Sequence, residues 1–239
     1  MKKLIVLSLA IGSLFARNLT YKVTAPLFGE VGKVNVTYFS AKSYEIKANM
    51  QTYGFAKKLS GNRVESYHAT GTVKNNRYYA SHFLQNASYK NKKSHLEYNF
   101  DYKRKKVYKT RKKWVDGKLK TNYTKPLNYF TYNDLFSAYH NIIAQLKNKP
   151  AGQYKMQVAG LEKYGGKLLI TIPNASTMQK EAKSMGAKDA WVFHIVTNKK
   201  ILGSKNGEII FAVGNDGIAK AVRVLDIPFV SHLDAKLVR

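Results

Sequence analysis

Polar and apolar residues alternate along most of this chain, and that pattern limits how it can fold more than any other feature. Residues 95–101, for example, read HLEYNFD. Because successive side chains of a β-strand point to opposite faces, a period of two predicts strands with one buried face. Comparable stretches lie at residues 20–24, 33–38, 44–50, 64–73, 106–115, 118–124, 154–159, 168–172, 190–197, 208–213 and 218–225. The sequence therefore predicts about a dozen strands.

Turn sequences indicate how these strands connect. Asp116-Gly117 lies between two predicted strands, and this pair tolerates the positive φ angles of a two-residue type I′ hairpin turn. Residues 215–217 (Asn-Asp-Gly) and 165–166 (Gly-Gly) occupy similar places between later strands. Sequential hairpins produce an antiparallel sheet, and a sheet of about a dozen strands must curl or close to protect its edges. We therefore predict a mainly β protein with a large curved antiparallel sheet or partly open barrel.

One amphipathic helix is predicted from Asn133 to Lys147. Asn133 and Asp134 suit its N-terminus, its apolar residues follow helical spacing along one face, and Pro150 ends it. We expect this helix to pack on the concave side of the sheet. A second, mostly polar helix is predicted over residues 176–185, followed by Gly186, and is interpreted as a surface excursion.

The sequence predicts a single domain over residues 17–239. It contains no internal repeat and no long linker rich in Pro, Gly or Ser, and only residues 147–152 could mark a boundary. A chain of 239 residues is long enough to bury a substantial core in one β domain.

Residues 1–16 have the order of a secretory signal peptide. Lys2 and Lys3 precede an apolar run from Leu4 to Leu14, and Ala16 suits a cleavage site. This run of about eleven residues is short for a membrane span, which takes roughly twenty. We therefore expect cleavage after Ala16 and a periplasmic protein. An uncleaved anchor or a buried first strand is the alternative.

The protein is strongly basic, with a formal net charge of +27 from 41 Lys and Arg and 14 Asp and Glu. Loss of Lys2 and Lys3 with the leader would leave 27 − 2 = +25. Such a charge draws a protein toward anionic lipid head groups, anionic polysaccharide or nucleic acid. Since an exported protein meets little nucleic acid, we expect lipid or another amphiphile and the anionic envelope surface as partners. A generally basic proteome is the alternative explanation.

The most basic segment, residues 102–114, interleaves Lys and Arg with Tyr and Trp. As a strand it would carry charge on both faces, which suits either an edge strand exposed to solvent or an anion-binding surface. Nucleic-acid binding there would require the protein to stay inside the cell. The candidate anion-binding residues are Lys103, Arg104, Lys105, Lys106, Lys109, Arg111, Lys112 and Lys113.

Sequence signatures of catalysis are absent. The six His residues lack the spacing of a zinc site, there is no Cys, and neither a Gly-x-Ser-x-Gly elbow nor a Gly-rich phosphate loop occurs. His95, Glu97 and Asp101 would share one strand face, which is ordinary in a half-solvated sheet. We therefore predict no enzyme activity, no metal and no cofactor.

Several segments together resemble a bacterial exported family, domain of unknown function 3108. They are YKV (21–23), LFGEVG (27–32), YNFDY (98–102), NDLFSAY (133–139) and GIAKAVRV (217–224). The resemblance spans nearly all of the chain after residue 16. It implies a periplasmic, all-antiparallel β protein similar to the half-barrel lipoprotein carriers, which curl a sheet around a helix and hold acyl chains. Residues 173–189 are more helical and more charged than the family pattern, which leaves the strand order there open.

These features predict a periplasmic binding or carrier module in which the curved sheet and the helix enclose an apolar cleft for a hydrophobic or amphiphilic envelope molecule. The first alternative is a structural or assembly factor whose sheet is packed solid and contacts another envelope protein or the wall. An envelope-acting hydrolase is a further alternative and rests on compartment alone.

Overall fold

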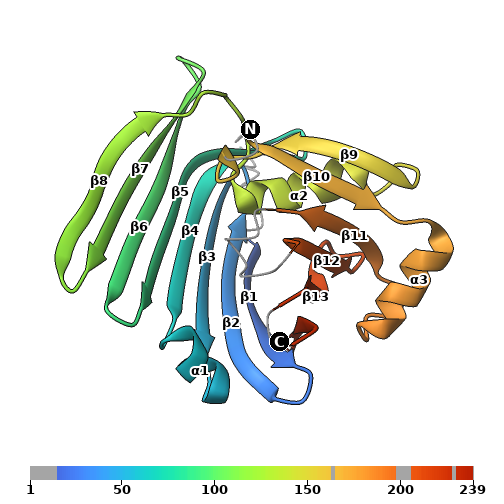
Figure 1. The fold of residues 1–239 in the computed structure, drawn as a ribbon. Coiled ribbons are helices and arrows are strands. Elements are labelled where there is room, and N and C mark those ends of the chain that lie inside the picture. The colour runs from blue at the N-terminus through green and yellow to red at the C-terminus, as the bar shows by residue number, and fades with distance from the viewer. Residues whose placement is uncertain (1–14, 163–164, 198–205, 228–229, 239) are drawn as a thin grey trace, which may run out of the picture.

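The computed structural model describes residues 15–162, 165–197, 206–227 and 230–238, which form one large antiparallel sheet with three helices (Figure 1). The predicted fold class is confirmed. The strands are β1 (Phe15–Ala25), β2 (Gly29–Ser40), β3 (Ser43–Thr52), β4 (Val64–Lys74), β5 (Arg77–Tyr89), β6 (Lys92–Asp101), β7 (Lys106–Val115), β8 (Lys118–Pro126), β9 (Gly152–Gln157), β10 (Lys167–Ile172), β11 (Trp191–Val196), β12 (Glu208–Val213), β13 (Ala219–Leu225) and β14 (His232–Leu237). The helices are α1 (Gly54–Ser60), α2 (Leu135–Leu146) and α3 (Ala175–Ser184).

Two meanders make up the sheet, and they meet where the first strand pairs with the last. The order is β8-β7-β6-β5-β4-β3-β2-β1-β14-β13-β12-β11-β10-β9. Tyr21 of β1 lies opposite Leu237 of β14, and Thr24 lies opposite Asp234. The two edges, β8 and β9, are therefore consecutive strands of the chain, and α2 lies in the connection between them. In Figure 1, α2 sits between the two halves of the sheet.

Alternation decides which side chains enter the core. Tyr44, Ile46 and Ala48 of β3 are buried, while Glu45 and Lys47 between them are not. This inner row continues across neighbouring strands, because Tyr38 in β2 lies opposite Ile46 and Ala69 in β4 lies opposite it on the other side. The Asp116-Gly117 hairpin is also confirmed, with φ angles of 52° and 74°.

Three elements were not predicted from the sequence. In β5, Ser81 is an extra residue in the pairing with β4, since Gly71 lies opposite Ala80 and Thr70 lies opposite His82. This bulge shifts the inner positions from even to odd numbers, which breaks the period of two. Strand β14 has half-buried residues on both faces, and α1 has only seven residues with no side-chain cap at Tyr53.

Helix α2 confirms the helix predicted from Asn133 to Lys147. Its N-cap is Asp134, whose side chain accepts hydrogen bonds from the N–H groups of Phe136 and Ser137. In return, the Asp134 N–H donates a hydrogen bond to Ser137 Oγ at 2.8 Å. This capping box satisfies the free donors of the first turn. Its apolar face packs inside the sheet, where Ile142 is 1% exposed.

Helix α3 is more than a surface excursion. Ala182 and Met185 are buried in a cluster with Val192 of β11 and Ala212 of β12, which lie on the outer side of the sheet. The helix is inserted between the paired strands β10 and β11, so the order of strands around residues 173–189 stays that of a simple meander. Gly186 follows the helix with a φ of 72°.

Phe15 and Ala16, the last residues of the predicted leader, begin β1 and lie opposite Ser40 and Phe39. The remainder of the predicted leader, residues 1–14, lies outside the described residues. Cleavage after Ala16 therefore stays a prediction. No helix in the described part of the chain is long and apolar enough to cross a membrane.

Candidate functional site

A cavity of about 770 Å³ lies between the inner side of the sheet and one face of α2. Strands β1–β3 line it on one side and β10–β13 on the other. Most lining side chains are apolar, among them Val36, Ile195 and Phe211. Since these residues sit at inner positions of their strands, the same alternation that builds the sheet also builds the apolar wall.

Asn141 attaches α2 to the sheet beside this cavity. Its side-chain oxygen accepts a hydrogen bond from the Tyr78 N–H at 2.9 Å, and its NH₂ group donates to the Tyr78 carbonyl at 2.8 Å. The amide also donates to Asn133 Oδ1 at 2.7 Å. Pairing of β5 with β6 begins only at His82, so no residue of β6 pairs with Tyr78. The Asn141 side chain bonds the Tyr78 N–H and carbonyl instead. These bonds fix α2 to the sheet, and residues of α2 such as Ile142 and Ile143 form part of the cavity lining.

Asp134 is fully buried at the start of α2. Burial raises its pKa to about 6, although the two backbone N–H groups and the Tyr44 hydroxyl, 3.3 Å from Oδ2, favour the ionised form. Tyr44 comes from β3, so the cap also ties the helix to the sheet. We interpret Asp134 as a structural group, because Asp134 is not among the cavity-lining residues.

One end of the cavity is polar. The hydroxyls of Tyr38 and Tyr78 are 2.5 Å apart, and Ser40 Oγ lies 3.4 Å from the Tyr78 hydroxyl. The rings of both tyrosines stack on His140 of α2, with centroid distances of 5.0 Å and 4.5 Å. Burial lowers the pKa of His140 to about 4, so the ring is neutral at pH 7. Arg17 of β1 lies opposite Tyr38 and also lines the cavity.

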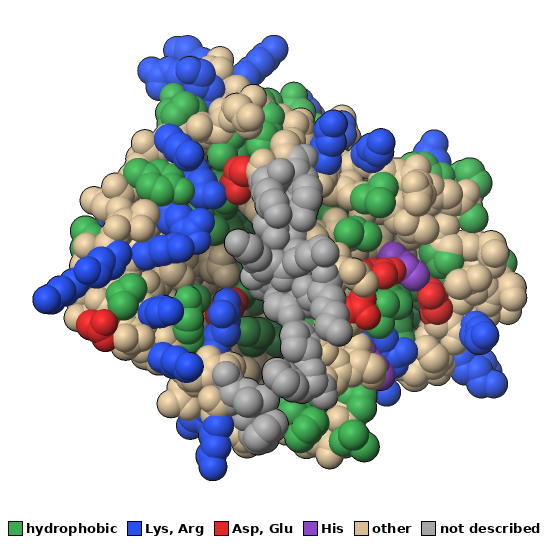
Figure 2. Space-filling model, viewed as in Figure 1, with side chains coloured by type: hydrophobic (Ala, Val, Ile, Leu, Met, Phe, Trp, Pro, Cys, Tyr) green, Lys and Arg blue, Asp and Glu red, His purple; other side chains and the backbone are tan. Residues whose placement is uncertain are grey.

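The predicted basic segment is divided between different environments. Lys103, Arg104, Lys105 and Lys106 are exposed at the turn between β6 and β7 and at the start of β7. Strand β7 lies between β6 and β8, with which it pairs on either side. The interpretation of this basic segment as an edge strand was therefore wrong. Figure 2 shows Lys and Arg side chains gathered over the half of the molecule that β4–β8 form.

Lys109 is buried and does not belong to an exposed surface. Its Nζ lies 3.0 Å from Glu162 Oε2 and 5.6 Å from the centre of the Tyr98 ring, and the Tyr98 hydroxyl donates to Glu162 Oε1 at 2.5 Å. Burial acts to raise the pKa of Glu162, but the bond from Tyr98 and the charge of Lys109 outweigh it and lower the pKa. Lys109 is therefore a structural residue.

Arg111 and Lys113 lie at inner positions of β7, and Lys112 lies on the outer face with its neighbour His95 of β6. The pKa of Lys113 is lowered, mainly by the nearby charge of Arg111 and to a smaller extent by burial and by the charge of Lys92. A second hollow of about 620 Å³ lies at the hairpin tips near these cations, lined by Lys90, Lys92, Lys93 and Trp114 among others. Lys and Asp make up half of its lining residues, whereas most side chains that line the first cavity are apolar.

The histidines of the outer face pair with carboxylates. His82 Nε2 lies 2.9 Å from Glu97, and His68 Nε2 lies 2.8 Å from Glu45. His194 lies between two carboxylates, with Nε2 2.8 Å from Glu181 and Nδ1 3.0 Å from Glu208. Even so, no group of three or more His, Cys, Asp or Glu within the described ranges is placed to hold a metal ion.

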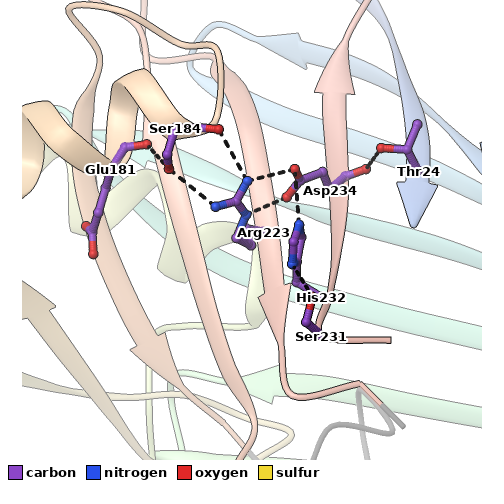
Figure 3. A network of polar contacts seen from close by, with 7 residues as sticks. All are labelled: Thr24, Glu181, Ser184, Arg223, Ser231, His232 and Asp234. Carbon is purple, nitrogen blue, oxygen red and sulfur yellow. Dashed lines mark hydrogen bonds and ion pairs between the residues drawn. The ribbon is translucent and has the colours of Figure 1, made fainter. Parts of the chain in front are cut away.

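A polar network on the outer face joins α3 to the sheet (Figure 3). The Arg223 guanidinium pairs with the Asp234 carboxylate through Nε at 2.7 Å and Nη2 at 2.8 Å, and it also donates to Ser184 at the end of α3. Thr24 of β1 donates to the Asp234 carbonyl at 3.5 Å. These contacts join β13, β14 and β1, so we assign them a structural role.

Comparisons with known proteins support the fold alone. The structure is similar to the crystal structure of a beta-barrel-like protein of domain of unknown function DUF1849 from Brucella abortus, with a TM-score of 0.54 and 12% sequence identity. The match covers 95% of this chain and 97% of that chain. No family model matches the sequence, and no curated protein matches it. A beta-barrel-like fold of unknown function is thus shown, and the resemblance to domain of unknown function 3108 stays a prediction.

Sequence reasoning missed the polar end of the cavity. Tyr38 was recognised only as a strand residue, and Arg17 was assigned to no site. The available signal was the position of Arg17, two residues before Leu19 and four before Tyr21, which places a cation on the apolar face of the first strand. Tyr78 and His140 gave no comparable signal, because their meeting depends on how α2 packs.

Proposed function

We propose that this protein is a periplasmic binding or carrier module for a hydrophobic or amphiphilic molecule of the cell envelope, without catalytic activity of its own. The apolar cavity of about 770 Å³ carries this proposal. Small-molecule sites are typically concave, mostly apolar and roughly 300–1,000 Å³ in volume. Moving apolar ligand surface from water into such a site is favourable by about 25 cal/mol per Å².

Two further observations support the proposal. The sequence resembles domain of unknown function 3108 and, through it, the half-barrel lipoprotein carriers. The exposed cations at residues 103–106 suit an approach to the anionic surfaces on which envelope amphiphiles reside. The same cations also favour a second candidate, an assembly factor that contacts an acidic envelope partner.

Ligand binding can be tested with a pair of neighbouring substitutions. Val36 points into the cavity from β2, and Thr37 points to the outer face from the next position. The natural protein, V36W and T37W would be purified from the envelope fraction, and the affinity of each for a fluorescent fatty-acyl probe would be measured. Native mass spectrometry of the same samples would identify co-purified lipid.

We expect V36W to lose at least about tenfold in probe affinity, because the indole occupies space that the ligand needs. T37W should bind like the natural protein. Circular dichroism checks that both variants fold. If V36W does not fold, V224W serves as a second variant, because Val224 lines the opposite wall of the cavity. If the natural protein binds no probe and carries no lipid, while crosslinking yields a stoichiometric protein partner, the assembly role replaces the carrier.

A further inference from the structure

Arg17 brings a positive charge into the wall of the apolar cavity. It occupies an inner position of β1, directly opposite Tyr38 of β2, and is half-buried. The neighbouring inner residues Leu19 and Tyr21 continue the cavity wall along the same strand. Placing a cation in an apolar wall costs desolvation energy, and an anionic partner would offset that cost.

The acidic residues of the chain do not balance it fully. All 14 Asp and Glu lie in the described ranges, and none of them forms an ion pair with Arg17. Asp216 lies close enough for the charge of Arg17 to help lower its pKa, but its carboxylate is bonded to Lys220 Nζ at 2.8 Å and to the Ile218 N–H at 3.1 Å. Arg17 and Lys220 thus share one carboxylate, and the three groups together carry a net positive charge.

Hydroxyl donors accompany the charge. Tyr38, Tyr78 and Ser40 are connected by two hydrogen bonds, at 2.5 Å and 3.4 Å. Three hydroxyls have three protons, and two bonds use two of them, so one proton is left to donate to a ligand. Burial raises the pKa of Tyr38, which keeps this phenol protonated.

We propose that Arg17 and the hydroxyls of Tyr38, Ser40 and Tyr78 form a head-group site for an amphiphile with one carboxylate or phosphate group. This inference rests on the proposed function and names the chemical class of its ligand. The guanidinium pairs with the anionic oxygens and a hydroxyl donates to them, which are the charge-assisted bonds that anions prefer.

The ligand chain would then follow the apolar remainder of the cavity. Val34 and Met50 lie on the cavity wall beyond Tyr38, four residues further along β2 and on its partner β3. At about 3.3 Å per residue, this wall extends roughly 13 Å from the head-group site. Ile209 and Val224 face it from the other half of the sheet.

Three probes of equal chain length separate the head group from the chain: a fatty acid, a lysophosphatidic acid and a fatty alcohol. The affinity of each would be measured for the natural protein, R17Q, Y38F and R77Q. Arg77 is an exposed cation beside Tyr78 that does not line the cavity, so R77Q removes the same charge without touching the site.

We expect R17Q to weaken one or both anionic probes by about tenfold or more, and Y38F to weaken them by less. The fatty alcohol should bind R17Q as it binds the natural protein, which also shows that R17Q is folded. R77Q should change nothing. The fatty acid and the lysophosphatidic acid distinguish a carboxylate from a phosphate head group.

Two results would overturn this inference, and they differ in meaning. If all three probes bind and R17Q weakens none of them, or weakens the alcohol equally, the cavity holds ligands but Arg17 is not the head-group site. If no probe binds the natural protein, the proposed function fails and the head-group site with it.

Discussion

The imidazole ring of His140 lies nearly parallel to the ring of Tyr78, with 4.5 Å between the ring centroids and 15° between the planes. His140 belongs to α2 and Tyr78 to β5, so this contact joins the helix to the sheet at the polar end of the cavity. Burial lowers the pKa of His140 to about 4, so the folded protein favours the neutral imidazole. The stability of this contact therefore depends on the charge of the ring.

The free energy of unfolding should therefore decrease in acid through His140. The folded-state pKa lies below the unfolded value of about 6.5, so the unfolded chain binds the proton first as the pH falls. The part of the unfolding free energy that depends on a neutral His140 is therefore fully present above about pH 6.5. About 2–3 kcal/mol of it is lost as the pH falls toward 4. Urea titrations of H140F, which keeps a stacked ring, should show a smaller loss over this range than the natural protein. Parallel curves would contradict the assignment.

Asn141→Ala should destabilise the fold by about 2–4 kcal/mol, because the N–H and the carbonyl of Tyr78 both lose their partner. Gln145→Ala, on the exposed side of the same helix, should change the stability by less than about 0.5 kcal/mol. Urea unfolding followed by circular dichroism measures both. Equal effects of the two substitutions would mean that Asn141 does not anchor α2.

Lys109→Met should cost about 1–3 kcal/mol of unfolding free energy, since it leaves the Glu162 carboxylate without its cation. Lys112→Met, on the outer face of the same strand, is the matched control and should be close to neutral. Because the pKa of Glu162 is lowered, its contribution is present above the unfolded pKa and is lost as the pH falls. The difference between the natural protein and K109M should accordingly shrink in acid.

Replacement of Lys103, Arg104, Lys105 and Lys106 by Gln should reduce binding to anionic lipid vesicles, and the reduction should be smaller at high salt. Each cation near an anionic membrane contributes on the order of 1 kcal/mol. Vesicle co-sedimentation of this variant and of the natural protein tests the predicted surface. Unchanged sedimentation would assign these residues to solubility alone.

The mass of protein recovered from the periplasm should correspond to a chain that begins at Arg17. Cell fractionation followed by intact-mass measurement tests the predicted cleavage after Ala16. Cleavage would shorten β1 by the two residues opposite Ser40 and Phe39 and would place a new ammonium group next to the Arg17 side chain. An intact chain in the cytoplasmic fraction would contradict both the leader and the proposed compartment.

Local patterns in the sequence were enough to predict most of the sheet. The alternation in residues 95–101 predicts β6, Asp116-Gly117 predicts the β7–β8 hairpin, and Asp134 predicts the start of α2, because each is decided by neighbours in the chain. Strand β5 was missed for a local reason as well, since the extra residue Ser81 changes which positions face inward.

The candidate site could not be predicted in the same way. The cavity combines residues from both meanders with α2, and its polar end depends on the contact of His140 with Tyr38 and Tyr78 across long stretches of chain. The basic segment shows the same limit. Composition cannot reveal that Lys109 is buried and paired with Glu162 while Lys105 is exposed to solvent.

The pairing of β1 with β14 has a consequence for how this protein acquires its structure. Thr24 and the residue that it contacts in β14 are separated by 210 positions, so the two meanders become one sheet only when nearly the whole polypeptide has been synthesised. Contacts between such distant positions raise the contact order and slow folding. Until then, each meander exposes a strand whose backbone groups are open to other chains, and this interval is where aggregation would begin.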